Sequence, residues 1–131
     1  MLINLSNHPS DKWGLEQTNA ALSQFGHTED MPFPQIDPEA DTTEIVELSM
    51  HFATECIELF REYKQQHPEA SMPNAVHVQG EFTFAHVIVN IFHKQGIKCL
   101  ASTTKRIVKE EEGGIKTSVF EFVQFRPYYS E

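Results

Sequence analysis

The chain has 131 residues, 40% of them hydrophobic, and a formal net charge of −9 at pH 7. This length suits one domain with its own core, and the negative charge argues against broad binding to duplex DNA, which depends on Lys and Arg to neutralise phosphates. The first residues show no leader pattern and no apolar run of about 18 residues occurs, so we expect a cytoplasmic protein without a membrane-spanning segment.

The first part of the chain predicts two strands around a helix. Residues 1–5 are apolar and predict the first strand, which a polar turn over residues 6–11 follows. A helix is predicted over about residues 12–25, because four residues share one of its faces: Leu15, Thr18, Leu22 and Phe25. Residues 27–31 predict a weaker second strand, which the three prolines between positions 32 and 38 end.

A long helix is predicted over about residues 42–66. Asp41 and Glu44 have the spacing of a capping box at its start. Its apolar face holds Ile45, Leu48, Phe52, Cys56, Leu59, Phe60 and Tyr63. Cys56 lies on this face and Cys99 in a later predicted strand, without metal-ligand spacing, so both are predicted to be buried thiols in a reducing compartment.

Residues 75–106 predict a βαβ unit around which the rest of the chain is organised. Residues 75–78 predict a short buried strand, and Gly80 permits a sharp turn into a helix. Residues 82–95 are apolar on nearly every face, which is typical of a buried helix. Residues 97–101 predict a second, parallel strand, and a polar loop over residues 102–106 is predicted to follow it.

The C-terminal part predicts a β-hairpin, because residues 106–110 and 115–125 flank a Glu-Glu-Gly-Gly turn. The whole pattern predicts an α/β fold, a Rossmann-like three-layer sandwich. Its sheet is mainly parallel, with strand order 2-1-3-4 and the C-terminal hairpin on the edge of the fourth strand. Since the chain then reverses direction between the first and third strands, a ligand crevice is expected between residues 7–10 and residues 80–83.

Glu81 and Thr83 are candidate site residues at this crevice. Glu81 begins the predicted helix, where the helix dipole stabilises a carboxylate. It either caps the helix only or faces the crevice as a base or ligand contact. Thr83 and the N–H groups after Gly80 can receive a phosphate or a ribose oxygen. Neither G-x-G-x-x-G nor a P-loop motif is present, so standard dinucleotide and P-loop sites are not predicted.

His8 follows the first strand, where it is either an acid/base group or a turn histidine bonded to the backbone. His77, His86 and His93 have apolar surroundings and are predicted to be satisfied core or rim residues. No H-E-x-x-H motif and no paired cysteines occur, so we predict no metal and no cofactor.

Residues 102–106, Ser-Thr-Thr-Lys-Arg, are a dense set of hydrogen-bond donors after a strand. They are either a polar loop entering the hairpin or a site for a phosphate or a developing anion. In so acidic a chain, a local Lys-Arg pair beside the crevice favours the binding role.

Three stretches resemble the CRISPR-associated Rossmann fold (CARF) proteins, in particular the small stand-alone members of type III CRISPR systems. They are Leu-Ser-Asn-His-Pro-Ser from position 5, Gln-Gly-Glu-Phe-Thr-Phe from position 79, and the run from Gly96-Ile97 to Ala-Ser-Thr-Thr-Lys-Arg at position 106. The layout agrees over nearly the whole chain. The resemblance implies a homodimer that binds cyclic oligoadenylate across its two-fold axis, with residues 82–92 near the interface or in the core. It also implies that the site is lined by Asn7, His8, Ser10, Gly80, Glu81, Thr83, Thr103, Thr104, Lys105 and Arg106.

Some members of that family are ring nucleases, which cleave the messenger. The resemblance then implies metal-independent attack of a ribose 2′-hydroxyl on the adjacent phosphate, with His8 or Glu81 moving the proton and Lys105 or Arg106 stabilising charge. Three other hypotheses stay open: a module that binds the ligand intact, a protein-interaction subunit with a vestigial crevice, and a Rossmann-like enzyme acting on a small phosphorylated metabolite.

Overall fold

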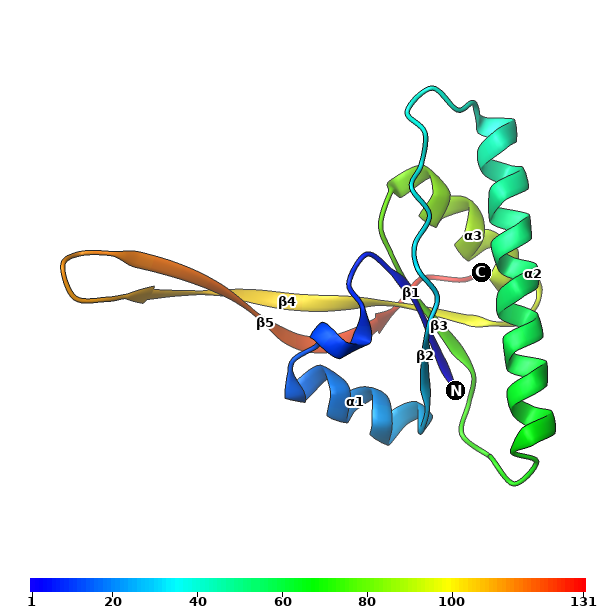
Figure 1. Cartoon of the computed structure of the whole chain (residues 1–131), viewed down its shortest axis with the longest axis horizontal. Coiled ribbons are helices and arrows are strands. Elements are labelled where there is room, and N and C mark those ends of the chain that lie inside the picture. Colours follow the sequence, from blue (N-terminus) through cyan, green and yellow to red (C-terminus); the bar gives the residue numbers. More distant parts are fainter.

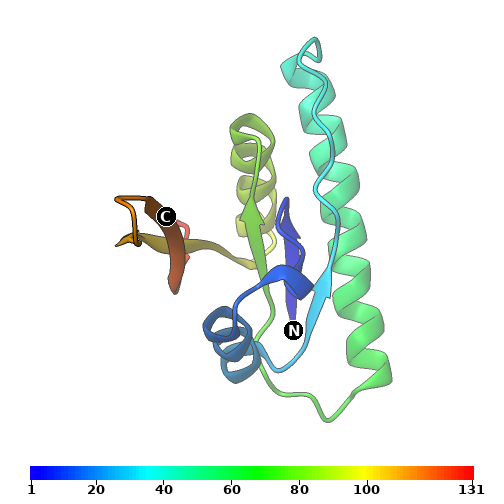
Figure 2. The ribbon, with the colours of Figure 1, turned by 60° about the vertical axis from the view of Figure 1, so that its left-hand side comes forward.

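The computed structural model describes residues 1–131 and shows a five-stranded sheet with helices on both faces (Figures 1 and 2). The strands are β1 (Leu2–Ser6), β2 (Thr28–Asp30), β3 (Ala75–Gln79), β4 (Lys98–Glu110) and β5 (Lys116–Pro127). The helices are α1 (Leu15–Phe25), α2 (Thr42–Gln66) and α3 (Phe82–Lys94), and a short 3-10 helix spans Ser10–Lys12. None of these helices combines the length and the apolar character that crossing a membrane requires.

The sheet order is β2-β1-β3-β4-β5, so the predicted order 2-1-3-4 is confirmed. The predicted hairpin is not a separate pair of strands, because its first strand continues β4 and its second strand is β5. β1, β2, β3 and β4 pair in parallel, and β5 runs antiparallel to β4. The carboxyl ends of β1 and β3 therefore lie side by side at the place where the chain reverses its direction across the sheet, which is where α/β sheets open a crevice.

Alternate residues of the strands pack into two hydrophobic clusters, one on each face of the sheet. Ile3, Val76 and Cys99 face α2 and α3, whereas Leu2 and Ala75 face α1. Cys56 joins the larger cluster, so both cysteines are buried free thiols as predicted. Burial raises the pKa of each thiol to about 12.

The long helix α2 has its predicted bounds and start. The Asp41 carboxylate accepts a hydrogen bond from the Glu44 N–H at 2.9 Å, and the Glu44 carboxylate accepts one from the Asp41 N–H at 2.7 Å. This capping box satisfies two backbone donors at the first turn. The predicted apolar face is confirmed, since Ile45, Cys56 and Phe60 are buried in the larger hydrophobic cluster. The other predicted residues of this face are partly buried against the same cluster, namely Leu48, Phe52, Leu59 and Tyr63.

The prediction for the first helix was wrong about its buried face. α1 begins at Leu15, and it buries Gln17, Ala21 and Phe25. Leu15 and Leu22, which were predicted to face the sheet, are 75% and 61% exposed. Phe25 is buried as predicted, and its ring lies 6.4 Å from that of Phe125. The buried face differs from the predicted one because Gln17 turns inward and donates a hydrogen bond to Ser102 Oγ.

The prediction that residues 82–95 are buried on nearly every face was also wrong. α3 buries one side, made of Phe84, Ala85, Ile88, Val89 and Phe92, while His86 and Asn90 are exposed. Phe82 is 89% exposed at the start of the helix. The reason is that α3 packs on the sheet and on α2 only, which leaves its outer side in solvent.

Residues 102–106 are not a loop. They belong to β4, which runs from Lys98 to Glu110 and pairs with β5 from Leu100 onward, with an irregularity between Thr103 and Thr104. Pairing with β5 satisfies the backbone groups of this segment, and its β-branched residues suit a strand. Only Lys98, Cys99 and Leu100 pair with β3. Residues 103–124 therefore form a two-stranded ribbon, here called the arm, which projects from the body (Figure 1).

Candidate functional site

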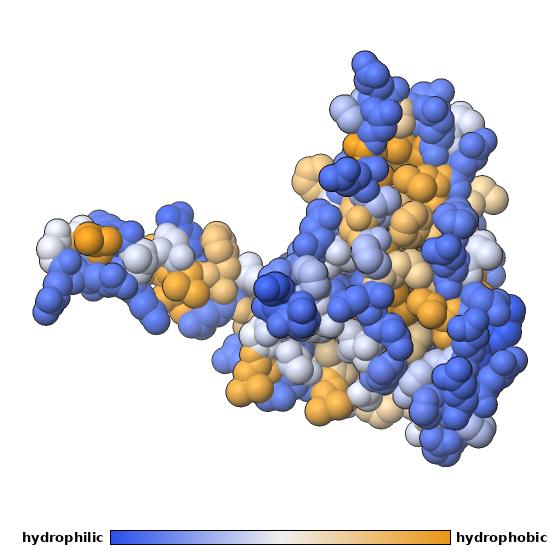
Figure 3. Space-filling view, in the orientation of Figure 1, coloured by the Kyte–Doolittle hydropathy of each residue, from blue (hydrophilic) through white to orange (hydrophobic).

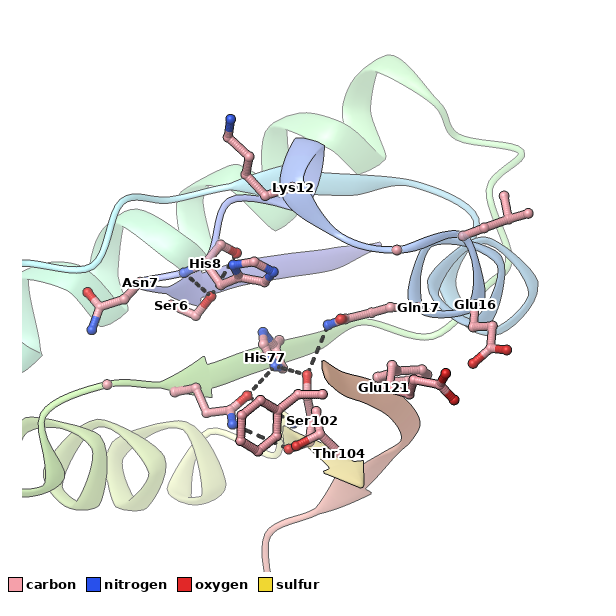
Figure 4. A pocket seen from close by; sticks show the side chains of 16 residues that line it. Ser6, Asn7, His8, Lys12, Glu16, Gln17, His77, Ser102, Thr104 and Glu121 are labelled. Atoms are coloured by element: carbon pink, nitrogen blue, oxygen red, sulfur yellow. Dashed lines mark hydrogen bonds between the residues drawn. The ribbon is translucent and has the colours of Figure 1, made fainter. Parts of the chain in front are cut away.

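A pocket of about 830 Å³ opens at the carboxyl ends of β1 and β3, between α1 and the base of the arm (Figure 4). It lies at the predicted crevice. The loop after β1 and the start of α1 contribute Ser6, Asn7, His8, Lys12, Gly14, Leu15, Glu16 and Gln17. The strands and the arm contribute His77, Gln79, Gly80, Ser102, Thr104, Phe120, Glu121 and Phe122.

Four of the predicted site residues line this pocket, namely Asn7, His8, Gly80 and Thr104. The others are not among its lining residues: Ser10, Glu81, Thr83, Thr103, Lys105 and Arg106. The topology thus predicts the place of the pocket correctly, whereas the extension of β4 carries Lys105 and Arg106 out along the arm.

Several of the displaced residues have structural partners. The Ser10 hydroxyl donates to Asp30 Oδ2 at 2.8 Å, which ties the turn after β1 to β2. The Arg106 guanidinium donates to the hydroxyl of Ser118 at 2.8 and 3.0 Å across the arm. The Thr103 hydroxyl donates to the Gln124 carbonyl at 3.3 Å.

Glu81 caps α3. Its carboxylate accepts hydrogen bonds from the N–H of Phe84 at 2.8 Å and the N–H of Thr83 at 3.1 Å, and the Thr83 hydroxyl donates to it at 2.7 Å. The bond from the Phe84 N–H, followed by that from the Thr83 hydroxyl, holds the pKa of Glu81 below its usual value. The N–H groups that were predicted to receive a phosphate therefore already bind this carboxylate.

Replacement of Glu81 by alanine is expected to lower the free energy of unfolding by about 1 kcal/mol, the usual effect of removing a helix cap, and to leave nucleotide affinity within twofold. Urea denaturation and calorimetry measure the two effects. Glu81→Asp is the matched control, because aspartate also caps helices well. If the Glu81→Ala protein has normal stability but no longer binds nucleotide, Glu81 is a ligand-binding residue and not only a helix cap.

The floor of the pocket is a hydrogen-bond network that sequence reasoning did not find. His77 lies at its centre and is 1% exposed, as expected of a satisfied core histidine. Its Nδ1 lies 2.8 Å from Asn4 Oδ1, and its Nε2 lies 2.6 Å from Ser102 Oγ. The Gln17 side chain reaches down from α1 and donates to Ser102 Oγ at 2.9 Å (Figure 4).

His77 is uncharged at neutral pH. Burial lowers its pKa from 6.5 to about 4, against a raising effect of the hydrogen bond with Gln79 and with a small further lowering by His8. The aromatic rings of Trp13 and Phe125 enclose the imidazole edge-on, at centroid distances of 5.7 and 5.6 Å. A neutral imidazole is the form that can accept a proton.

The upper part of the pocket carries charges and aromatic surface. Lys12 contributes a cation, and Glu16 and Glu121 contribute carboxylates. Phe120, which is 68% exposed, and Phe122 form the wall on the arm side. No group of three or more His, Cys, Asp or Glu side chains converges on a point where a metal ion would be held.

The fold is that of an α/β protein, with a polar, partly aromatic pocket at the carboxyl ends of parallel strands. The sequence model of a family described as "Uncharacterized protein MJ1673 family" matches residues 1–126. The chain belongs to this MJ1673 family. No curated protein and no solved structure matches it.

Proposed function

We propose that the pocket binds a nucleotide, and that the chain is a Rossmann-like protein whose ligand is a cyclic oligoadenylate. The observation that carries nucleotide binding is the composition of the pocket. Amide, hydroxyl and imidazole groups at a strand-end crevice lie opposite the exposed ring of Phe120. The choice of cyclic oligoadenylate rests on the resemblance of three stretches to CARF proteins, with Asn7, His8, Gly80 and Thr104 as the predicted residues that line the pocket.

The chemistry of the pocket suits a phosphodiester better than a polyphosphate. Phe120 and Phe122 offer faces on which a base can stack, and Lys12 offers one cation for a phosphate. Glu16 and Glu121 line the same space and would repel a dense cluster of negative charge. A phosphodiester, with one charge per phosphate, is repelled less by these carboxylates than a polyphosphate is, and Lys12 offers the contact for one such phosphate.

We also propose that the protein acts as a homodimer, because a ligand with a two-fold axis suits an isologous pair of subunits. α3 packs its apolar side into the protomer's own core. The arm instead exposes apolar side chains on a ribbon that no third strand covers, namely those of Val108, Ile115, Val119, Phe120 and Val123 (Figure 3). An isolated two-stranded ribbon is only marginally stable in water, so a second copy is the partner that we propose for this surface.

The test is calorimetric titration with cyclic tetra- and hexa-adenylate, together with sedimentation of the same samples. Phe120→Ala is expected to weaken binding about tenfold, or about 1.4 kcal/mol, within the range for loss of one base–aromatic stack. Phe82→Ala is the matched control, because Phe82 is 89% exposed and is not a lining residue of the pocket. Absence of binding, or equal effects of the two variants, would contradict the proposal.

Cleavage of the bound ligand is a second candidate function. It is favoured by the presence of His8 and of the Ser102–His77 pair at the pocket. Glu81 no longer stands as a base, since its carboxylate caps α3. Chromatography of the ligand after incubation without added metal separates the two functions: linear products indicate a nuclease, and intact bound ligand indicates a binding module.

A further inference from the structure

The hydroxyl of Ser102, the imidazole of His77 and the amide of Asn4 form a continuous chain of hydrogen bonds across three neighbouring strands. The orientation of Asn4 is fixed, because its Nδ2 donates to the His8 carbonyl at 2.9 Å and to Asp30 Oδ1 at 2.8 Å. Its Oδ1 must then face His77 Nδ1 as an acceptor. This acceptor favours the tautomer with the proton on Nδ1, in which Nε2 presents its lone pair to Ser102. Gln79 Oε1, 2.8 Å from Nε2, favours the other tautomer, so the first is the reactive form and the second an inactive one.

In the tautomer with the proton on Nδ1, the Ser102 hydroxyl donates to His77. Gln17 Nε2 donates to Ser102 Oγ at 2.9 Å, and His77 Nε2 lies 2.6 Å from the same oxygen on the other side. The same Gln17 N–H stabilises negative charge on Oγ once that proton has left. Both features lower the free energy needed to form an alkoxide at Ser102.

Gln79 provides a second hydrogen-bond acceptor for the protonated form of His77. Gln79 Oε1 lies 2.8 Å from His77 Nε2, and the backbone of Ser102 fixes this amide by donating to Oε1 at 3.1 Å and accepting from its Nε2 at 3.3 Å. In the tautomer with the proton on Nδ1, Oε1 faces the lone pair of Nε2; in the other tautomer it accepts a hydrogen bond from Nε2. After proton transfer the new N–H has Gln79 Oε1 as acceptor, while the Nδ1 N–H keeps Asn4 Oδ1.

Of the hydrogen-bonded residues in this network, Ser102 is the one whose hydroxyl a ligand in the pocket can reach. His77 is buried, whereas Ser102 is half-buried and lines the pocket. Lys12 and Gln17 line the same pocket and can receive the oxygens of a phosphate. A phosphate beside the network also favours the charged form of His77 and thereby raises its basicity from the resting value.

We propose that Ser102 is a nucleophile of this pocket, with His77 as its general base and Asn4 holding the imidazole in place, and that its substrate class is a phosphodiester. Ser102 Oγ bonds to phosphorus as the bond from phosphorus to the leaving ribose oxygen breaks. The hydroxyl proton passes to His77 Nε2 and then to the leaving oxygen. Water then attacks the phosphorus of the phosphoserine ester and gives one proton to His77. The bond from phosphorus to Ser102 Oγ breaks, and His77 passes this proton to Oγ, which restores the Ser102 hydroxyl. This activity goes beyond ligand binding and does not use a ribose 2′-hydroxyl.

The test uses diisopropyl fluorophosphate, which reports an activated serine without any nucleotide. Peptide mass mapping is expected to place a single adduct on Ser102, and His77→Gln is expected to slow labelling about 100-fold, the scale of general base catalysis. Ser118→Ala is the control, because Ser118 is an exposed hydroxyl on the arm. An unlabelled Ser102 in the wild-type protein would overturn the proposal.

A second variant keeps His77 intact and so does not depend on how well His77→Gln folds. In Ser102→Cys the new thiol lies beside the imidazole, and it is expected to react with iodoacetamide at pH 7 at least about tenfold faster than the thiol in Ser118→Cys. Cys56 and Cys99 are buried and serve as internal references. Equal rates would contradict the proposal, and because no nucleotide is present, either result leaves the proposed ligand to be judged by titration.

Discussion

Lowering the pH from 7 to 4 is expected to reduce the free energy of unfolding by about 3 kcal/mol through His77 alone. Burial depresses the pKa of the folded-state imidazole from 6.5 to about 4. Below pH 6.5 His77 binds a proton in the unfolded chain, whereas in the folded protein it stays neutral until the pH approaches 4. The stabilising effect of the neutral imidazole is therefore complete above pH 6.5 and is lost as the pH falls toward 4.

Urea denaturation at half-unit steps of pH measures this effect. His77→Gln is the comparison, because glutamine can hydrogen-bond but does not titrate. Carboxylates such as Glu81, whose pKa is lowered by its cap bonds, contribute to acid destabilisation in both proteins and cancel in the difference. Parallel stability curves for the two proteins between pH 7 and 4 would show that His77 keeps its ordinary pKa in the fold.

Gly80→Val is expected to lower the free energy of unfolding by about 1–3 kcal/mol, the usual range for overpacking. A Cβ at Gly80 would lie 2.3 to 2.6 Å from three atoms of the Phe33 ring, which is closer than contact permits. The φ angle of Gly80 is not positive, so crowding by Phe33 and not backbone strain requires the glycine. The sequence predicts a sharp turn at Gly80, and the structure shows that the Phe33 ring occupies the space of a side chain there.

A double-mutant cycle tests whether crowding by the Phe33 ring is the reason that a side chain at position 80 destabilises the fold. Phe33→Ala alone loses an edge-on contact with Phe84, whose centroid lies 5.0 Å away. In the Phe33→Ala background, Gly80→Ala is expected to be nearly neutral, although it destabilises the wild-type protein. If the two substitutions add within about 0.5 kcal/mol, their sites do not interact, and Phe33 is not what excludes a side chain at Gly80.

The features that follow from local pattern and connectivity could be predicted from the sequence. α2 carries its own capping box and a long apolar face, and the strand order follows from right-handed crossovers between parallel strands. The same connectivity places Asn7, His8 and Gly80 at one crevice. Features set by distant residues could not be predicted: Gln17 of α1 is turned inward by its hydrogen bond to Ser102, and pairing with β5 makes residues 102–106 part of a strand.

The network on the pocket floor depends on strand register, which local patterns do not fix. Asn4 lies directly opposite His77 on the neighbouring strand, and Ser102 lies two residues beyond Leu100, the partner of His77 on the other side. A signal was nonetheless present. Asn4 and His77 are polar residues flanked on both sides by apolar ones in two buried strands, and a buried polar side chain needs a partner.

The arm has a consequence for the dynamics of the protein. Beyond Leu100 its backbone hydrogen bonds run only between β4 and β5, so it can open without disturbing the parallel sheet. Amide hydrogens along residues 105–120 then exchange with solvent through this local opening, while those of β1 and β3 wait for global unfolding. Because Phe120 belongs to both the arm and the pocket wall, the proposed ligand would hold the ribbon closed by stacking on it, and slowed exchange along the arm would then report that the pocket is occupied.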